Sequence, residues 1–439
     1  MPDVHSVSVF DRLKDIASIN AASLPASTHL DYEFDYLEIS NVDYHGIVDV
    51  AAIERLSFEA APSRARRVVR DGCTIISSVR PNLQAVAHIE TEQTDLVCST
   101  GFNVVQPLLN KLHPRYAYYV LISEEARQYF ESVATGVGYP AVADKDFGSL
   151  RLYIPKLAEQ QKMTAFLDLS CAAIDSAVAA KRKQIDALFG IRKSLLQRVV
   201  TRGIHADPKL IDTGNTWLEQ IPEGWSLVML KRLADIQSGL TLGKVYEDED
   251  LVEYPYLRVA NVQDGYVDLA DVSTLEVPAA FAAGVMLRAG DVLMTEGGDL
   301  DKLGRGTVWE GQIEPCLHQN HVFAVRCHAH KLLPQFLAYV TAAQYGRDYF
   351  EATGKRTTNL AATNSTKVGM FYIPLPPLEE QRELVRYLDT ELGRLAAIEA
   401  NIGKQIDTLL AYRKSLIHEC VTGKRRVTSA DFSETAAHA

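Results

Sequence analysis

Apolar residues recur at alternating spacings of four and three from Leu388 to Cys420, with Glu399 and Arg413 filling two of the positions. This heptad repeat predicts a long α-helix with one apolar seam, as in coiled coils. A weaker seam runs from Leu167 to Val199. The positions predicted to pack a helix pair are Leu167, Ile174, Ile185, Leu188, Leu195, Leu388, Leu392, Leu395, Ile402, Ile406, Leu409 and Leu416. At 1.5 Å per residue, a stretch of ~40 residues makes a rod about 60 Å long.

The same signal precedes each helix. Tyr153 begins YIPKLAEQQKMTAFL, and Tyr372 begins YIPLPPLEEQRELVRYL. A residue before proline is biased towards extended backbone, so each signal closes one element and starts a helix. Other segments also occur twice, as RLKDIASI with RLADIQSG, YLEISNV with YLRVANV, and IRKSLL with YRKSLI. The nearly constant offset, about 220 residues, indicates a duplicated unit of half the chain.

Short β-like runs broken by Gly, Asn and Asp fill the first part of each copy, for example YLEISNV and CTIISSV. Such runs, with a helical stretch before Y-I-P, predict a mixed domain of roughly 150 residues. The expected fold class is α+β, with two mixed α/β domains separated by two long antiparallel helices in a coiled coil with a pseudo-twofold internal repeat. The alternative is that each helix covers only its own domain. The predicted ranges are 1–155 and 204–374 for the domains, 156–203 and 375–425 for the helices, and 426–439 for a disordered tail.

Composition narrows the functional classes. The net charge of -11 argues against a chain that coats itself in nucleic acid, although Arg192 and Lys193 belong to a basic zone that could contact phosphate. The six cysteines are scattered, and no uninterrupted apolar run approaches the ~18 residues of a membrane helix. We therefore expect a cytoplasmic protein with no membrane partner. The segment CLHQNHVFAVRCHAH fits no standard zinc spacing, so no metal is predicted.

Sequence motifs for catalysis are missing. The sequence has no G-x-x-x-x-G-K-[ST] for ATP and no N-P-P-[YF] or D-P-P-Y of adenine methyltransferases. The chain is therefore predicted not to be an enzyme and to hold no cofactor itself.

The order of these segments resembles the DNA-specificity subunit of type I restriction-modification systems. PLPPLEEQRELVRYLD with AYRKSLIHECVTGK carries the resemblance in the second copy, and PKLAEQQKMTAFLD with GIRKSLLQRVVTRG carries it in the first. The resemblance implies two target recognition domains that each read half of a split double-stranded DNA target, and helices that set the unread spacer. It also implies two modification subunits that use S-adenosylmethionine, and restriction subunits, where the host has them, that use ATP and Mg.

Polar and basic turn segments supply the candidate DNA contacts. Arginine can pair with guanine, and Asn or Gln with adenine, while lysine suits phosphate. The glycines of GGDLDKLGRG would let a backbone approach a groove closely. The candidates are Arg64, Arg67, Arg80, Asn82, Gln84, Tyr139 and Lys145 in the first copy, and Lys302, Arg305, Lys355, Arg356, Thr357, Thr358 and Asn359 in the second.

Two other classes of function stay open at this stage. One is a coiled-coil adaptor whose two heads bind proteins or glycans, which would suit the acidic charge. The other is an enzyme fused to its own DNA reader, although two heads of about 150 residues leave little room for a catalytic domain. A salt titration of DNA binding separates the first of these from DNA recognition, because phosphate contacts weaken steeply with salt.

Overall fold

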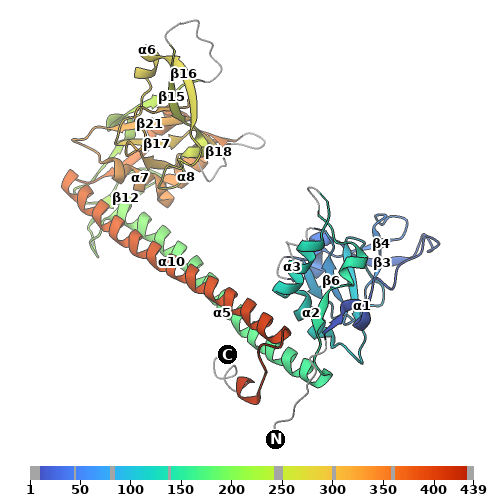
Figure 1. Cartoon of the computed structure of the whole chain (residues 1–439). Helices are drawn as coiled ribbons and strands as arrows, with labels where there is room; N and C mark the ends of the chain where they lie inside the picture. The colour runs from blue at the N-terminus through green and yellow to red at the C-terminus, as the bar shows by residue number, and fades with distance from the viewer. Residues whose placement is uncertain are drawn as a thin grey trace. The chain divides into compact units, whose positions relative to one another are not determined.

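The computed structural model describes residues 10–43, 46–79, 85–136, 140–241, 251–298, 303–356 and 361–432. The chain divides into two compact units (Figure 1). Unit 1 comprises residues 1–182 and 403–439, and unit 2 comprises residues 183–402. Each unit therefore takes its globular body from one copy of the repeat and helical segments from both.

Unit 1 contains two four-stranded sheets. The first has the strand order β2 (Ala17–Ile19), β9 (Phe102–Pro107), β6 (Thr74–Ser77) and β7 (Val86–His88), and all its neighbours are antiparallel. The second has the order β4 (Glu54–Ser57), β3 (Glu33–Leu37), β8 (Leu96–Ser99) and β5 (Ala65–Val68), with β3 and β8 parallel. A short pair, β1 (Phe10–Arg12) with β10 (Arg151–Tyr153), joins the start of the body to its end.

Alternating side chains of the first sheet of unit 1 face two different layers. Ile76 and Val105 pack on the side of α2 (Pro114–Leu121) and α3 (Glu124–Val133), whereas Ile75 and Val104 pack on the side of the second sheet. Successive residues of a strand point to opposite faces, so fully apolar strands such as β6 are buried on both. The short helices α1 (Leu13–Ile16) and α4 (Asp144–Phe147) contribute Leu13, Ile16 and Phe147 to the same core as α2 and α3.

Unit 2 repeats this plan. Its four-stranded sheet has the order β14 (Ala234–Ser238), β21 (Val322–Cys327), β17 (Asp291–Thr295) and β19 (Gly306–Val308), beside a sheet of β16 (Ser273–Pro278), β15 (Leu251–Leu257) and β20 (Leu317–His318). The helices α7 (Pro334–Ala342), α8 (Gln344–Thr353) and α9 (Ser365–Met370) correspond to α2, α3 and α4. Unit 2 also contains α6 (Ala279–Ala283) and the pairs β11 (Leu210–Asp212) with β12 (Gln220–Pro222) and β13 (Ser226–Met229) with β24 (Tyr372–Leu375).

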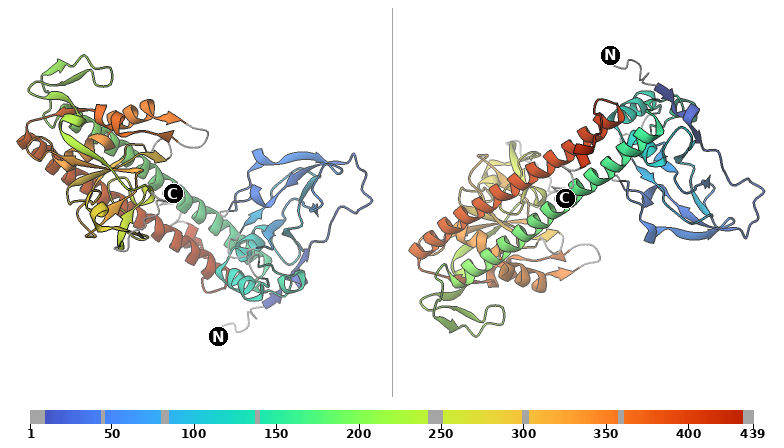
Figure 2. Two further views of the ribbon diagram at one scale, coloured as in Figure 1. Left: turned by 90° about the horizontal axis from the view of Figure 1, so that it is seen from above. Right: turned by 90° about the horizontal axis from the view of Figure 1, so that it is seen from below.

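The two long helices are α5 (Leu157–Arg202) and α10 (Leu378–Val421), close to the predicted ranges. The start of α5 packs with the end of α10 in unit 1, where Leu167 and Leu416 share a core. The end of α5 packs with the start of α10 in unit 2, where Val199 and Leu388 do the same. The helices are therefore antiparallel, and their segments lie side by side within each unit (Figure 2). The alternative that each helix covers only its own domain is wrong.

The predicted seam residues are covered along both helices. Leu167, Ile174, Leu388, Ile402 and Leu416 are buried, and the other seven are half-buried. Neither helix breaks at its internal glycines, because Gly190, Gly393 and Gly403 all lie inside continuous helix. An 18-residue window of α5 has a mean hydropathy of 1.4, so α5 could cross a membrane by length and composition alone. That window is 44% buried within the protein, and the packing of α5 accounts for its apolar composition.

A buried glutamine fixes the start of each long helix to its globular body. Gln160 accepts a hydrogen bond from the His113 backbone N–H at 2.8 Å and donates to the backbone carbonyls of Lys111 and Pro155. Gln381 makes the equivalent three bonds with Leu333, Lys331 and Pro376. Neither glutamine is accessible to solvent. The repeated Glu-Gln pair therefore marks the junction between head and helix.

The segment after α10 corrects one prediction. Residues 426–432 were expected to be disordered, yet Val427 is buried and Phe432 packs against Phe166 with ring centroids 6.0 Å apart. Asp431 accepts hydrogen bonds from the Thr428 hydroxyl, from Arg425 and from the Thr428 backbone N–H, which hold its pKa near 2. These few apolar contacts could not be predicted from the sequence, because the segment is mostly polar. Residues 433–439 lie outside the described part of the chain.

Candidate nucleic-acid interface

In unit 1, the segments that flank two candidate DNA loops, 80–84 and 137–139, are hydrogen-bonded to each other. Ala141, at the end of the Gly-rich segment, forms antiparallel bridges with both Val79 and Thr135. The Val142 N–H donates to the Ser78 carbonyl at 3.0 Å. The segment containing Arg80 and the segment containing Tyr139 therefore start from one shared set of backbone hydrogen bonds.

Unit 2 joins its own two candidate loops in the same way. A three-stranded sheet has the order β18 (Gly297–Gly298), β23 (Ala361–Ala362) and β22 (Lys355–Arg356). The Thr363 N–H donates to the Glu296 carbonyl at 2.7 Å. This sheet brings the glycine-rich segment beside the Lys-Arg-Thr-Thr segment, which are about 60 residues apart in sequence. In both units, therefore, main-chain hydrogen bonds join the described segments that flank two candidate DNA loops.

The predicted DNA contacts fall into three groups. Lys145 and Lys355 are exposed beside these loops, and Arg64 is exposed but paired with Glu38. Arg67 is held inside unit 1, where only 14% of its side chain is exposed. Except for Arg305, the others lie outside the described residues, or have an undescribed side chain, and stay predictions: Arg80, Asn82, Gln84, Tyr139, Lys302, Arg356, Thr357, Thr358 and Asn359.

The guanidinium of Arg67 is bound by other residues of unit 1. It donates to the Phe102 carbonyl and to Asn103 Oδ1, and it lies 3.8 Å from Asp144. Burial lowers its pKa from the usual arginine value. The cluster of arginines from 64 to 70 did not indicate in the sequence that the Arg67 side chain would be buried. The reason is that a β-bulge between Ala65 and Arg67 changes the direction of the strand locally.

Arg192, Lys193 and Arg305, all candidates for contact with DNA in the sequence, come together in unit 2. All three line a cavity of unit 2 between the helices and the head. Arg305 follows the glycine-rich segment, but its Nε is buried in the cavity wall. Sequence reasoning placed Arg305 on a groove-facing loop and had no means to bring it next to a helix more than 100 residues away.

The His and Cys cluster belongs to the strands of unit 2. His318 is fully buried in β20, and its Nδ1 lies 2.6 Å from the Val322 carbonyl. Burial lowers the pKa of His318. His321 instead contacts Glu296 at 2.6 Å, at the base of the glycine-rich segment. In the part of the chain that the structure describes, no three His, Cys, Asp or Glu side chains group as metal ligands would.

Sequence reasoning missed the backbone groups that join the loops and the hydrogen bonds of the two buried glutamines. The Glu-Gln pair occurs in both copies, and this repetition could have pointed to Gln160 and Gln381. A polar side chain at the start of an apolar helix needs a hydrogen-bond partner if it is buried. The bridges at Val79 and Ala141 had no sequence signal, since they use main-chain atoms only.

Comparison with known proteins agrees with this architecture. Residues 9–186 and 222–408 match the family described as the type I restriction modification DNA specificity domain, which confirms the resemblance seen in the motifs. The chain is 26% identical to the type I restriction enzyme MjaVIII specificity subunit of Methanocaldococcus jannaschii, over 72% of this chain and 71% of that one. It is 25% identical to the EcoKI specificity subunit of Escherichia coli, over 65% of this chain and 59% of that one.

A third relative and two solved structures complete the comparison. The putative MjaX specificity subunit of Methanocaldococcus jannaschii is 28% identical, and the match spans about half of each chain, 47% here and 48% there. A chain from a study of assembly and conformational transition of the type I R-M system has a TM-score of 0.77 and 22% identity, covering 97% of this chain and all of that one. The HsdS subunit from Thermoanaerobacter tengcongensis has a TM-score of 0.56 at 22% identity, covering 97% and 99%. The predicted fold class is confirmed.

Proposed function

The chain belongs to the type I restriction modification DNA specificity family, and from this premise we propose that it recognises a bipartite sequence in double-stranded DNA. Unit 1 reads one half of the target, and unit 2 reads the other. The observation that carries the proposal is that the segments flanking two candidate DNA loops are joined in each body, by Ala141 in unit 1 and by β23 in unit 2.

The two loop pairs differ in the way that two different half-sites require. Unit 1 has ATGVGYPAVADKD where unit 2 has ATGKRTTNLAATNSTK. The main-chain hydrogen bonds that join the segments flanking the loops are alike in the two units. The polar side chains that could reach the edges of DNA bases are different. Phosphate contacts position a protein on DNA, and base-edge contacts give specificity, so the shared frame and the divergent loops serve separate purposes.

The exposed surfaces of the long helices suit partner proteins. Phe189, Ile191, Ile398 and Tyr412 expose 69%, 53%, 48% and 52% of their surface although they lie in helix. In the proposed assembly this chain is non-catalytic and cytoplasmic and binds two modification subunits that bring S-adenosylmethionine. Restriction subunits, with ATP and Mg, join where the host has them. The net charge of -11 fits a chain that leaves much of the phosphate neutralisation to its partners.

The test is to co-express the chain with its modification subunit and to map methylated adenines by sequencing. The expected motif has two defined halves and an undefined spacer. Replacing residues 135–141 alone should change one half of the motif and leave the other half and the spacer unchanged. A motif that is continuous, or both halves changing together, would contradict the proposal.

A second measurement addresses the chain by itself. Because of its acidic charge, the purified chain should bind target DNA weakly at physiological salt, with affinity falling log-linearly as salt rises. Tight binding by the isolated chain would show that the partners are not needed for phosphate contact. No DNA binding by the assembled complex, with capture of a protein or glycan, would favour the adaptor alternative.

A further inference from the structure

Unit 2 contains a cavity of about 680 Å³ at the junction of its head with the helix pair. Its walls come from both long helices, from α7 and α8, and from the segment leading into β19. The volume lies within the range of ~300–1,000 Å³ that small-molecule sites occupy. Six polar residues of its wall are central to its chemistry: Arg192, Lys193, Arg305, Tyr339, Gln344 and Arg347.

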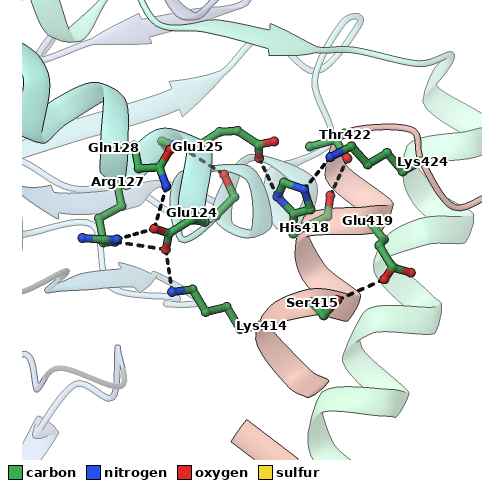
Figure 3. Close-up of polar contacts among 12 residues, drawn as sticks. Glu124, Glu125, Arg127, Gln128, Lys414, Ser415, His418, Glu419, Thr422 and Lys424 are labelled. Carbon is green, nitrogen blue, oxygen red and sulfur yellow. Dashed lines mark hydrogen bonds and ion pairs between the residues drawn. The ribbon is translucent and has the colours of Figure 1, made fainter. Parts of the chain in front are cut away.

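In unit 1, the residues equivalent to some of these wall residues surround a carboxylate. Glu124, at the start of α3, accepts hydrogen bonds from Arg127 and from Gln128 and pairs with Lys414 of α10 at 2.6 Å (Figure 3). The Arg127 hydrogen bonds, followed by the Lys414 contact, lower the pKa of Glu124 to about 2. A carboxylate thus ties the head of unit 1 to the end of the second long helix.

The carboxylate is missing at the same position in unit 2. Gln344 stands at the start of α8 where Glu124 stands in α3, and Lys193 stands in R-K-S-L where Lys414 stands in the other copy. Gln344 donates its amide to Asp348 instead. Among the residues that the structure describes, Lys193 makes no ion pair within 4.0 Å. One cation of the cavity has therefore lost the partner that its duplicate keeps.

Two more cations of the cavity have no acidic partner. Arg413 in unit 1 pairs with Asp175 at 3.1 Å, but its equivalent Arg192 faces a helix that has Ala396 in place of that aspartate. Arg305 has a buried Nε with no hydrogen-bond acceptor within the described structure. A buried donor without a partner is unfavourable because it has lost its hydrogen bonds to water, so an acceptor entering the cavity would be favoured.

Smaller side chains and an outward turn create the space. Arg115 in unit 1, bonded to Asp168 at 2.8 Å, is replaced by Gln335 in the cavity wall. A Cβ on Gly46 of unit 1 would lie 2.2 Å from a β7 carbonyl, whereas a Cβ on the equivalent Gly265 would meet nothing within 4 Å. The turn that packs against the sheet in unit 1 therefore leaves open space beside the cavity in unit 2.

Among the described residues, the carboxylates that also line the cavity make no ion pair with Arg192, Lys193 or Arg305. Asp264 pairs with Arg347 at 2.7 Å, and Asp389 accepts the hydroxyl proton of Tyr339. Glu310 and Glu351 are exposed at the surface. Arg192 and Lys193 are exposed as well, so the lining has four basic and four acidic side chains. Of the four basic ones, Arg192, Lys193 and Arg305 make no ion pair within 4.0 Å among the described residues.

We propose that this cavity binds a small anion with two negative charges, a phosphate monoester or a dicarboxylate, whose oxygens take the place of the Glu124 carboxylate between Lys193, Arg192 and Arg305. The apolar part of such a ligand would lie against Leu196 and Leu392, which share the wall. Arginine and lysine together favour phosphate or carboxylate oxygens through charge-assisted hydrogen bonds. The site does not depend on DNA recognition.

Isothermal titration calorimetry of the full chain in chloride buffer of constant ionic strength tests the proposal. Inorganic phosphate and succinate are the two probes. We expect at least one of them to bind with a Kd below about 1 mM. Which probe binds more tightly distinguishes a phosphate ligand from a dicarboxylate.

Gln344→Glu is the discriminating variant, because it restores the carboxylate that unit 1 carries at this position. It should weaken probe binding by at least about tenfold, and Lys193→Gln should do the same by removing a cation. Glu124→Gln is the matched control in unit 1 and should leave binding unchanged. Circular dichroism confirms that each variant is folded.

The proposal is overturned if neither probe binds wild-type protein above the chloride background, or if binding survives unchanged in both Gln344→Glu and Lys193→Gln. Loss of binding in Glu124→Gln would also overturn it, because the anion would then sit in unit 1. If Gln344→Glu does not fold, Lys193→Gln alone decides the outcome.

Discussion

The junctions between head and helix in the two units have the same hydrogen-bonded glutamine but different electrostatics. Gln160 and Gln381 make matching sets of three hydrogen bonds. Where the head meets the helix pair, Glu124 of unit 1 pairs with Lys414, while unit 2 has Gln344 in the wall of a cavity. This difference indicates which contacts both copies of a duplicated fold need for stability. A fully buried polar group has no substitute once water is excluded, whereas a partly exposed ion pair can be lost at small cost.

The largest expected effect comes from breaking the shared contact. Gln381→Ala should destabilise unit 2 by about 3 kcal/mol, because it leaves the Leu333 N–H and the Lys331 carbonyl without a buried partner. Gln160→Ala should do the same in unit 1. Urea unfolding followed by circular dichroism measures both. Gln161→Ala, an exposed neighbour in the same helix turn, is the control and should stay within about 0.5 kcal/mol of wild type.

The second prediction uses pH to test the electrostatic difference. The folded pKa of Glu124, about 2, lies below its usual value of 4.5, so its contribution is full above pH 4.5 and is lost as the pH falls towards 2. Glu124→Gln should therefore cost about 1 kcal/mol at pH 6 and progressively less below pH 4.5. Urea midpoints of the two proteins from pH 6 to pH 3 measure the gap. A gap that is constant over this range would show that the carboxylate is not charged in its ion pair.

The third prediction compares the two loop pairs under the proposed function. Lys355→Ala in unit 2 and Lys145→Ala in unit 1 should each weaken DNA binding by the assembled complex about threefold and reduce the salt slope by roughly one. Neither should change the methylated motif, because phosphate contacts carry no sequence information. Fluorescence anisotropy across a salt series measures the slope. Arg67→Gln is not equivalent, since its side chain stabilises the body of unit 1.

The smallest expected effect concerns the helices that both units share. Gly190→Ala and Gly393→Ala should each stabilise the protein by about 0.5–1 kcal/mol, because a Cβ at either position meets no atom within 4 Å and alanine loses less entropy in a helix. Gly203→Ala and Gly423→Ala should instead destabilise it, since these residues have φ of +75° and +74°. Thermal unfolding midpoints measure all four. Equal effects at both pairs would contradict the helical geometry.

Local pattern and repetition by themselves determined the elements of this protein. The heptad spacing located α5 and α10, because one apolar stripe on a helix can be satisfied only by another apolar surface. The constant offset of the repeated segments identified two bodies of one plan. Even the segments that became the paired loops could be located, since turn residues and glycines punctuate strands.

Only the tertiary structure decided which surfaces those elements share. Arg67 reads as a surface cation in sequence and is largely buried, and Arg305 follows a predicted DNA loop yet lines a cavity with residues of a distant helix. Val427 and Phe432 follow a polar sequence and still pack into a core. Periodicity depends on neighbours along the chain, so it fixes the elements. Burial, ion pairing and empty space depend on what lies opposite, which a linear pattern does not encode.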